Sequence, residues 1–518
     1  MLTPFVNEPF TNFQDENNRK AMKLALTKVK NSFGHTYPLY IGSEKIYTKT
    51  TTPSINPGKV SETIGYMSSA NRELAEKAMQ KALDTFETWK KVSPEERASY
   101  LFKAANLMRE RKHEFSSLLV FEAGKNWAEA DADTAEAIDF LEFYAREMIR
   151  LDRINETLPP TQIPTEKSQL RYIPLGVGIV IPPWNFPLAI CVGMTSAAIV
   201  SGNTVLLKPA SPTSIIAYQF VSLMKEVGLP PGVINFIPGN PNEIGDFLTA
   251  HPKTRFISFT GSKQVGLHIN KLAANTAKNQ IWIKRVIAEM GGKDGIIVDE
   301  TADLDQAAQQ IVASAFGFQG QKCSAGSRAI LVDSIYDQVV SKILDLTKTF
   351  TIGLPEENHP IGPVIDQKAY DKILSYIEIG KQEGSLLLGG STASGDGFYI
   401  QPTIFGEVDQ EARIMQEEIF GPVLAITRAT DWQEAIQIYN HTEYGLTGSF
   451  FSKDEHRIQQ AQEQMHCGNL YINRKCTGAL VGVHPFGGFN MSGTDSKAGG
   501  YDYLLLFTQA KSISRQIS

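Results

Sequence analysis

The chain has 518 residues, roughly three to four times the length of a typical domain, which is enough for two or more domains with substantial cores. Hydrophobic residues make up 42% and charged residues 20%, a composition that excludes extended disorder. The 50 basic and 56 acidic residues give a formal charge of −6, so the charge balance favours neither nucleic acid nor an anionic membrane as a partner. We therefore expect a small-molecule partner.

The N-terminal stretch and the cysteines indicate a cytoplasmic, reducing environment. The stretch MLTPFVNEPFTNFQDENNRK lacks the basic start and apolar centre of a signal peptide. The longest apolar stretch, PLAICVGMTSAAIV, is too short and too polar to span a membrane. The four cysteines form no C-x-x-C pair and no Cys/His pattern of zinc spacing, so we expect free thiols and no metal site.

A helical region is expected first along the chain. The segment SPEERASYLFKAANLMRERKHEF begins with Ser93 at an N-cap position, Pro94 at the first helical position and Glu96 three residues after the cap, which is the capping-box pattern. Its apolar residues recur at helical spacing, and the preceding segment RELAEKAMQKALDTFETWKK repeats the pattern. We predict a largely helical chain to about residue 150.

Two α/β units are expected next. From about residue 170, the β-branched runs GVGIVIPP, NTVLLKP, GVINFIPG and RFISFTG alternate with helical stretches, which predicts right-handed βαβ units and a parallel sheet covered on both faces. After about residue 292 the alternation restarts with SRAILVD, QPTIFG, PVLAITRAT and GLTGSFFS. A second α/β unit is the simplest account.

Two segments do not fit a core. LPPTQIPTEKSQLRYIPLG is rich in proline and polar residues, which predicts an extended arm or hairpin. The final segment YDYLLLFTQAKSISRQIS follows a glycine pair and is typical of a short strand. Because such a strand would leave an unpaired edge, we expect it to pair with another subunit.

Three residues could carry chemistry. Cys323 lies in QGQKCSAGS; most free cysteines are small core residues, but this one has polar neighbours, and Lys322 would favour its thiolate. Glu289 ends an apolar run in IAEMGGKD, where desolvation could make it a general base, although a solvated carboxylate at a strand end is commoner. Asn185, in the Pro-bracketed turn IPPWNFP, could donate its amide N–H to an oxyanion.

Two strand ends could hold a ligand. RFISFTGSKQVG predicts a strand, a glycine turn and a helix that begins near Ser262 and carries Gly266, and a helix start can bind pyrophosphate. Taken alone, this pattern is more typical of an ordinary turn than of a nucleotide site. Lys208 directly follows an apolar strand in LLKPAS, where open α/β sheets bind ligands, yet a surface lysine is the simpler interpretation.

Together these segments resemble the aldehyde dehydrogenase superfamily. PWNFP, LKPA, FTGSKQVG, EMGGKD, GQKC, EEIFGPV and PFGG occur in the order of that family, from about residue 40 to the end. The resemblance implies that Cys323 is the nucleophile, Glu289 the base and Asn185 the oxyanion donor. Cysteine suits this chemistry because its thioester with the oxidised substrate can be hydrolysed.

The resemblance also implies a bound NAD. Lys208 matches a ligand of the adenosine ribose, Ser262 a pyrophosphate contact, Glu418 a ligand of the nicotinamide ribose, and Phe420 a neighbour of the nicotinamide. Ser211 stands where NAD-preferring members often have a Glu, and without that carboxylate a 2′-phosphate is excluded less strongly. We expect NAD and leave NADP open. The full implied set of cofactor contacts is Pro183, Trp184, Lys208, Ser211, Gly239, Gly261, Ser262, Gly266, Glu418 and Phe420.

The family architecture implies a Rossmann-type cofactor domain, an α/β catalytic domain and a β oligomerisation arm. Carried over, residues 41–150 and 175–291 form the NAD-binding domain, 292–491 the catalytic domain, and 151–174 with 492–518 the arm. We expect a homodimer or a higher homo-oligomer of dimers. Residues 1–40 form an N-terminal extension without an identifiable function.

The resemblance narrows to the branch that oxidises L-glutamate 5-semialdehyde to L-glutamate in proline or arginine breakdown. GQKCSAGSR, KCTGALVGVHPFGG and TAEAIDFLEFYAR carry it. The N–H groups of Gly478 and Ala479, with the Ser324 hydroxyl, would form a small neutral nest that binds a carboxylate without a buried Arg, although an empty glycine turn is an equal alternative. The remaining implied substrate neighbours are Phe186 as a tunnel wall, and Glu136 near Lys322 and Ser324.

Other interpretations stay open. Succinate semialdehyde and other short ω-carboxylated aldehydes need an anion site but no amino-acid site. A cofactor-free thiol hydrolase using Cys323 would need a histidine base, and only His484, just before PFGG, adjoins one of the motifs. A catalytically silent binding protein is disfavoured because nucleophile, base and oxyanion donor are all present.

Overall fold

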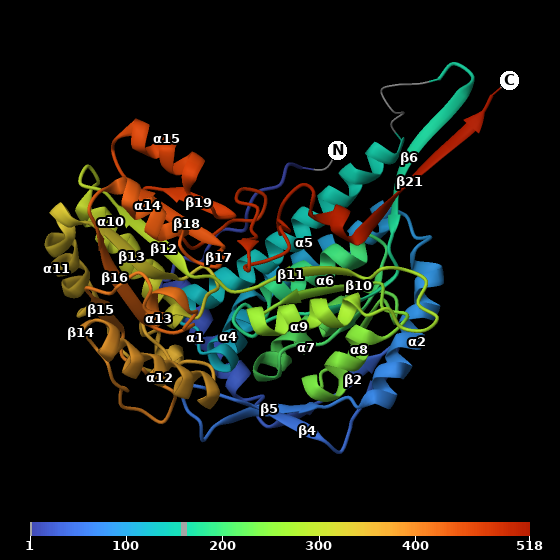
Figure 1. The fold of residues 1–518 in the computed structure, drawn as a ribbon. Helices are drawn as coiled ribbons and strands as arrows, with labels where there is room; N and C mark the ends of the chain where they lie inside the picture. The colour runs from blue at the N-terminus through green and yellow to red at the C-terminus, as the bar shows by residue number, and fades with distance from the viewer. Residues whose placement is uncertain (1–2, 157–162, 518) are drawn as a thin grey trace.

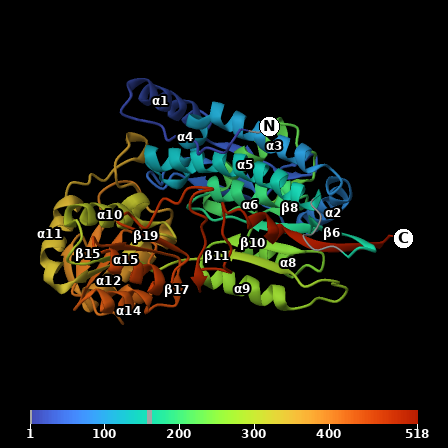
Figure 2. The same cartoon turned by 90° about the horizontal axis from the view of Figure 1, so that it is seen from above.

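Two α/β lobes and a projecting arm make up the fold (Figure 1). The computed structural model describes residues 3–156 and 163–517. Figure 1 shows the lobe of the later chain (yellow to orange) beside the lobe of the earlier chain (blue to green), and Figure 2 shows the same division from above. No helix among the described residues is long and apolar enough to cross a membrane.

The sheet of the first lobe has the strand order β11-β10-β7-β8-β9-β2-β3. Strands β7 to β11 run parallel, as the alternation predicted, and β2 pairs antiparallel with β9 and β3. The strands in that order are Arg285–Glu289, Phe256–Thr260, Val177–Ile181, Thr204–Leu207, Ile234–Phe236, Leu39–Ile41 and Glu44–Ile46.

Helices cover both faces of this sheet, as predicted. Val180 and Leu207 point into a core shared with the helices α3 to α7, whereas Ile179 and Leu206 point into a second core with α2, α8 and α9. This alternation along one strand is what a doubly covered sheet requires. The helices are α2 Arg72–Trp89, α3 Pro94–Glu110, α4 Lys112–Ala123, α5 Trp127–Glu156, α6 Ala189–Val200, α7 Ser214–Glu226, α8 Asp246–Ala250 and α9 Lys263–Ala274.

The sheet of the second lobe has the order β14-β15-β16-β13-β12-β18-β19 and is parallel except for β14. Its strands in that order are Ser385–Leu388, Thr403–Gly406, Val423–Ala429, Gly326–Val332, Asp294–Val298, Thr447–Phe451 and Asn469–Ile472. One face packs on α10 Leu304–Phe316 and α11 Tyr336–Thr347. The other face packs on α12 Gln367–Glu383, α13 Arg413–Gln416, α14 Trp432–Asn440 and α15 Glu455–Gln464.

The N-terminal part is less helical than predicted. The predicted N-cap of the capping box is confirmed, because the Ser93 hydroxyl accepts a hydrogen bond from the Glu96 N–H at the start of α3. However, five strands lie between residues 35 and 68, where Thr, Tyr and Ile are frequent and favour extended backbone. Besides β2 and β3 they are β1 His35–Tyr37, β4 Thr51–Ile55 and β5 Thr63–Ser68, and they follow the helix α1 Glu16–Lys30.

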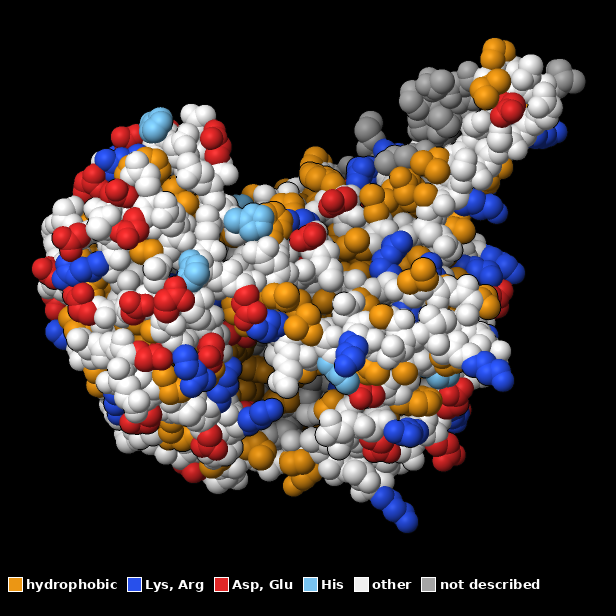
Figure 3. All heavy atoms as spheres, viewed as in Figure 1, with side chains coloured by type: hydrophobic (Ala, Val, Ile, Leu, Met, Phe, Trp, Pro, Cys, Tyr) orange, Lys and Arg blue, Asp and Glu red, His pale blue; other side chains and the backbone are white. Residues whose placement is uncertain are grey.

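The arm is a two-stranded antiparallel ribbon. β6 (Glu166–Pro174) pairs along its whole length with β21 (Thr508–Gln516), so one edge of the C-terminal strand is satisfied within the chain. Residues Tyr503–Phe507, predicted as strand, form a 3₁₀ turn instead. The arm exposes Ile163, Leu170 and Ile517, and Figure 3 shows hydrophobic side chains along it. Residues 157–162 of the predicted arm lie outside the described residues.

Candidate active site

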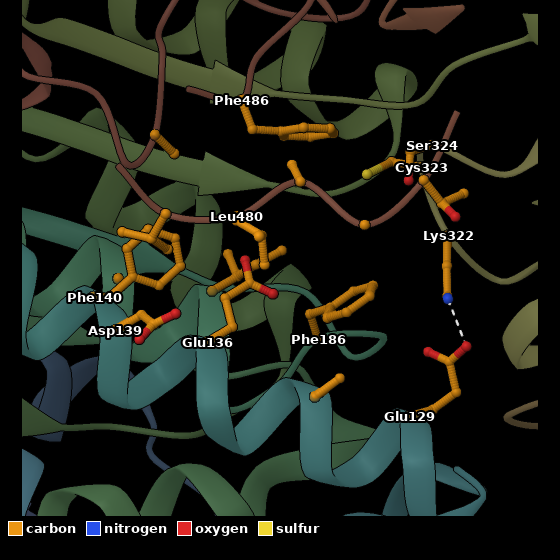
Figure 4. Close-up of a pocket in the computed structure, with 18 of the residues that line it drawn as sticks. Glu129, Glu136, Asp139, Phe140, Phe186, Lys322, Cys323, Ser324, Leu480 and Phe486 are labelled. Atoms are coloured by element: carbon orange, nitrogen blue, oxygen red, sulfur yellow. Dashed lines mark hydrogen bonds and ion pairs between the residues drawn. The ribbon is translucent and has the colours of Figure 1, made fainter. Parts of the chain in front are cut away.

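A cavity of about 490 Å³ brings distant parts of the chain together around Cys323 (Figure 4). Its walls come from α5, from Phe186 after β7, from the turn that carries Cys323, and from the loop 474–481. The predicted substrate-side residues all line it: Glu136, Phe186, Lys322, Ser324, Gly478 and Ala479. Glu289 lines the same cavity, so the structure brings the predicted base and nucleophile into one space.

Cys323 lies on a tightly bent segment between α10 and β13. Phe318 and Gln319 have φ angles of 50° and 54°, a left-handed conformation that is uncommon for such residues. Gly320 follows, and a Cβ there would come 2.2 Å from the carbonyl oxygen of Gly421. The bend therefore depends on surrounding packing, which aims the cysteine into the cavity.

The expectation that Lys322 favours a thiolate at Cys323 is wrong. The Lys322 ammonium forms an ion pair with Glu129 at 2.7 Å, and Figure 4 shows it directed away from the sulfur. Burial raises the pKa of the Cys323 thiol, and the nearby carboxyls of Asp294, Glu418 and Glu289 raise it further. A free thiolate is consequently disfavoured until the proton has an acceptor.

Glu289 is the last residue of β11, and its side chain rests against the C-terminal part of the chain. It accepts hydrogen bonds from the Ser496 hydroxyl and, at 3.3 Å, from the Gly488 N–H. Burial raises the pKa of Glu289 to about 8, and these two hydrogen bonds act in the opposite direction. A carboxyl with this pKa ionises just above neutral pH, and its ionised form can accept a proton.

Asn185 is positioned by the turn that leads to the cysteine. It is buried, and its Nδ2 atom donates a hydrogen bond to the Gln321 carbonyl oxygen at 3.0 Å. An amide nitrogen carries two hydrogens, so this bond leaves a second N–H. The structure therefore places the predicted oxyanion donor against the segment that carries Cys323.

The carboxyl ends of β8 and β10 carry the predicted adenosine and pyrophosphate contacts. Lys208 follows β8 directly and is buried; burial lowers the pKa of its ammonium to about 8, and no acidic partner pairs with it among the described residues. Ser262 is the N-cap of α9, and Ser211 begins a 3₁₀ turn and is exposed. Both strands end at the same edge of the parallel sheet, where such sheets bind ligands. An unpaired buried cation at the same sheet edge as a helix start fits an anionic dinucleotide.

The Glu418 carboxyl lies close to the backbone of Gly291 and Gly292. Its Oε1 atom accepts a hydrogen bond from the Gly292 N–H at 3.2 Å, and a Cβ at Gly291 would lie 2.1 Å from that oxygen. Burial raises the pKa of Glu418, and Lys372 opposes this shift. The carboxyl therefore leaves no room for a side chain at Gly291, the first glycine of the EMGGKD motif.

Aromatic and glycine contacts complete the predicted cofactor set. Phe420 has a φ of 62° and packs edge-on against Trp184, which follows Pro183, with ring centroids 5.5 Å apart. Gly266 on α9 lies against Met290, where a Cβ would come 2.4 Å from the sulfur. The other two predicted glycines, Gly239 and Gly261, follow β9 and β10.

The loop 477–481 presents free N–H groups near Ser324. Gly478 has a φ of 77°, and Arg474 holds the carbonyl oxygens of Thr477 and Gly478 at 3.0 and 3.1 Å. In the described parts of the chain, no hydrogen bond uses the N–H groups of Gly478 and Ala479 or the Ser324 hydroxyl as donor. The predicted nest is not electrically neutral, however, because Arg474 and Lys475 also line the cavity.

Glu136 faces the cavity, but not where the resemblance placed it. Figure 4 shows its carboxyl between Phe140 and Phe186, whereas Glu129, two turns earlier on α5, pairs with Lys322. Burial raises the pKa of Glu136 to about 8, and the neighbouring Asp133 adds to the shift. Glu136 is therefore largely uncharged at neutral pH.

A known family accounts for nearly the whole chain. The model of the aldehyde dehydrogenase family matches residues 45–513. The chain belongs to the aldehyde dehydrogenase family.

Individual aldehyde dehydrogenases resemble it closely. A 1-pyrroline-5-carboxylate dehydrogenase of Anoxybacillus flavithermus (strain DSM 21510 / WK1) is 58% identical over 515 residues, 99% of each chain. The crystal structure of a 1-pyrroline-5-carboxylate dehydrogenase from Thermus with bound NAD is 49% identical, with a TM-score of 0.98 over 100% of both chains. A betaine aldehyde dehydrogenase of Staphylococcus aureus in complex with NAD⁺ is 30% identical, with a TM-score of 0.89 over 96% of this chain and 97% of that one.

The thiol hydrolase alternative finds no support in this aldehyde dehydrogenase. His484 contacts the Leu480 N–H at 3.2 Å and Arg474 at 3.3 Å, so it braces the 477–481 loop. It is absent from the described lining of the cavity that contains Cys323.

The sequence reasoning also missed several lining residues. Besides the predicted Glu136, three acids of α5 line the cavity: Glu129, Asp131 and Asp139. Glu129 and Asp139 share a helical face with Glu136, and this spacing was the available signal.

Proposed function

We propose that this chain oxidises L-glutamate 5-semialdehyde, the open form of 1-pyrroline-5-carboxylate, to L-glutamate. The observation that carries the proposal is the single cavity that joins Cys323 to Ser324 and the free N–H groups of Gly478 and Ala479. An aldehyde beside the sulfur can extend its carboxylate to these donors. The full-length likeness to 1-pyrroline-5-carboxylate dehydrogenases supports the same substrate.

The reaction begins at Cys323. Its sulfur attacks the aldehyde carbon and forms a thiohemiacetal, and the Asn185 amide and the Cys323 N–H stabilise the oxyanion. Because burial raises the pKa of this thiol, the sulfur has to lose its proton to solvent water as it attacks.

Glu289 serves the second half of the reaction, the hydrolysis of the thioester. Once the thioester has formed on Cys323, the carboxylate takes a proton from water, and the water attacks the acyl carbon to release the acid. In the structure Glu289 rests against Ser496 and Gly488, so it must turn from this pose toward the thioester.

The chain's own residues fit NAD. When bound, NAD supplies the acceptor for the hydride that leaves the thiohemiacetal carbon. Lys208 and the Ser262 helix start would hold the adenosine and pyrophosphate end, and Glu418 with Phe420 the nicotinamide end. Ser211 offers no carboxylate to exclude a 2′-phosphate, so NADP stays a weaker second choice.

The organisation of the chain follows from these roles. We assign NAD binding to residues 41–150 and 175–291, catalysis to 292–491, and subunit contact to 151–174 and 492–518. The exposed apolar residues of the arm suit a homodimer or a homo-oligomer of dimers. The free cysteines suit the cytoplasm.

NADH formation tests the proposal directly. The purified protein, mixed with NAD and glutamate semialdehyde, should produce NADH, and Cys323→Ala should abolish the signal while NAD binding persists. Succinate semialdehyde and hexanal serve as comparison substrates. A kcat/KM for either that equals or exceeds that for glutamate semialdehyde would contradict the substrate assignment, and no NADH with any aldehyde and either cofactor would contradict the reaction.

A further inference from the structure

An N-terminal segment closes part of the substrate cavity. Residues 3–13, here called the strap, precede α1 and cross the cavity-facing side of α5. Phe10 and Thr11 of the strap line the cavity itself. The family model begins at residue 45, so the strap lies outside the region that it matches.

Two acids of α5 hold the strap. Asp131 accepts hydrogen bonds from the N–H and hydroxyl of Thr11 at 2.7 and 2.6 Å. Asp139 accepts them from the Asn7 amide at 2.8 Å and the Glu8 N–H at 2.6 Å. Both acids are buried and line the cavity, so the strap covers two carboxylates that would otherwise face an anionic substrate.

The other acids of this helix face are neutralised without the strap. Glu129 is paired with Lys322, and burial raises the pKa of Glu136 to about 8. Asp131 is itself paired with Lys112 at 3.2 Å. The contribution of the strap is therefore to supply hydrogen-bond donors to the oxygens of Asp131 and Asp139.

The strap also holds the loop that carries the free N–H groups. The Asn7 amide donates a second hydrogen bond, at 2.9 Å, to the carbonyl oxygen of Val481. Phe5 packs edge-on against Phe143 and contacts Gly482. One side chain, Asn7, thus joins Asp139 on α5 to the end of the 477–481 loop.

Phe10 occupies a different environment from the other strap aromatics. Phe5 and Phe13 pack against the core and anchor the strap at both ends. Phe10, between them, is 61% exposed and still borders the cavity. Figure 4 shows Asp139, which binds the strap, at the opposite end of the cavity from Cys323. Phe10 therefore borders both the cavity and solvent, where a substrate too long for the cavity would meet it.

We propose that the strap is a specificity-determining element: Phe10 limits the length of the aldehyde, and Asn7 holds the carboxylate-binding loop in place. This inference rests on the proposed oxidation of glutamate semialdehyde. It assigns a role to the segment for which the sequence offered none.

The test compares substrate chain lengths in Phe10→Ala and wild type. Opening the far end should raise kcat/KM for linear aldehydes from hexanal to decanal, by up to about fourfold for each added methylene that becomes buried. The value for glutamate semialdehyde should stay within about twofold, because the short substrate does not reach Phe10. Val6→Ala is the matched control, since Val6 is 80% exposed and is not among the lining residues.

Asn7→Ala tests the second part. It should raise KM for glutamate semialdehyde about two- to tenfold, the effect of one or two lost hydrogen bonds, and leave KM for NAD unchanged. Unchanged long-aldehyde activity in Phe10→Ala, together with an unchanged semialdehyde KM in Asn7→Ala, would overturn the strap proposal. Inactivity of the wild type on glutamate semialdehyde would instead overturn the proposed function.

Discussion

The proposed cofactor side and the aldehyde side of Cys323 are built in different ways. On the cofactor side, Lys208 and Ser262 directly follow parallel strands of one sheet, so each contact comes from a short local motif. On the aldehyde side, the cavity combines α5, the loop 474–481 and the strap, which are more than a hundred positions apart in the chain. Sheet geometry fixes the first side, whereas hydrogen bonds between distant segments fix the second.

The largest expected effect concerns the residue between the two sides. Glu289→Gln should lower kcat by about 10²–10⁴-fold, the usual contribution of a general base. NADH should still appear in a first burst, because the carboxylate is needed most for hydrolysis of the thioester. Rapid mixing with glutamate semialdehyde and NAD measures both phases, and loss of the burst would contradict the assigned role.

The same residue predicts a pH dependence in the wild type. Burial raises the pKa of Glu289 to about 8, so the carboxyl is mostly protonated at pH 7 and ionises as the pH rises. Thioester hydrolysis should therefore accelerate with pH and level off above about 8. A single-turnover pH series would measure this, and a rate that falls over the same interval would have the wrong sign.

A substitution on the cofactor side should have a smaller effect that is confined to NAD binding. Lys208→Met removes the buried ammonium and should raise KM for NAD. The expected loss of binding free energy is up to about 3 kcal/mol, the upper range for a hydrogen bond to a charged group. The fold should persist, because methionine fills similar space without a buried charge. KM for glutamate semialdehyde should not change, and an equal rise in both constants would show that the two sides are not independent.

A substitution on the aldehyde side should have an effect of similar size that is confined to the aldehyde. Ser324→Ala should raise KM for glutamate semialdehyde, because the hydroxyl would no longer donate to the substrate carboxylate. The expected loss of binding free energy is ~1.5–3 kcal/mol. Hexanal has no carboxylate and serves as the internal control. Steady-state kinetics with both substrates measure the difference, and equal losses would indicate disturbed packing at the neighbouring Cys323.

Sequence reasoning predicted the cofactor side better than the aldehyde side. Strand ends, the N-cap at Ser262 and the lysine after β8 are local features, so residue spacing predicted them and the structure confirms their places. The pairing of Lys322 with Glu129 joins residues far apart in the chain, and the neighbouring Cys323 offered a simpler but wrong partner.

The N-terminal region shows the same limit. The helical periodicity that follows is a stronger signal than the β-branched residues between 35 and 68, so the sequence did not predict the five strands there. The strap has no regular secondary structure, so no periodicity marked it. Its position depends on Asp131 and Asp139, which only folding brings beside it.

The most direct measurement of the central claim is the mass of the covalent intermediate. Glu289→Gln, mixed with NAD and glutamate semialdehyde and quenched in acid, should carry a glutamyl thioester. After tryptic digestion the added mass should lie on the peptide that begins at Cys323 and ends at Arg328. An adduct on Cys191, Cys467 or Cys476, or no adduct during NADH formation, would contradict the account.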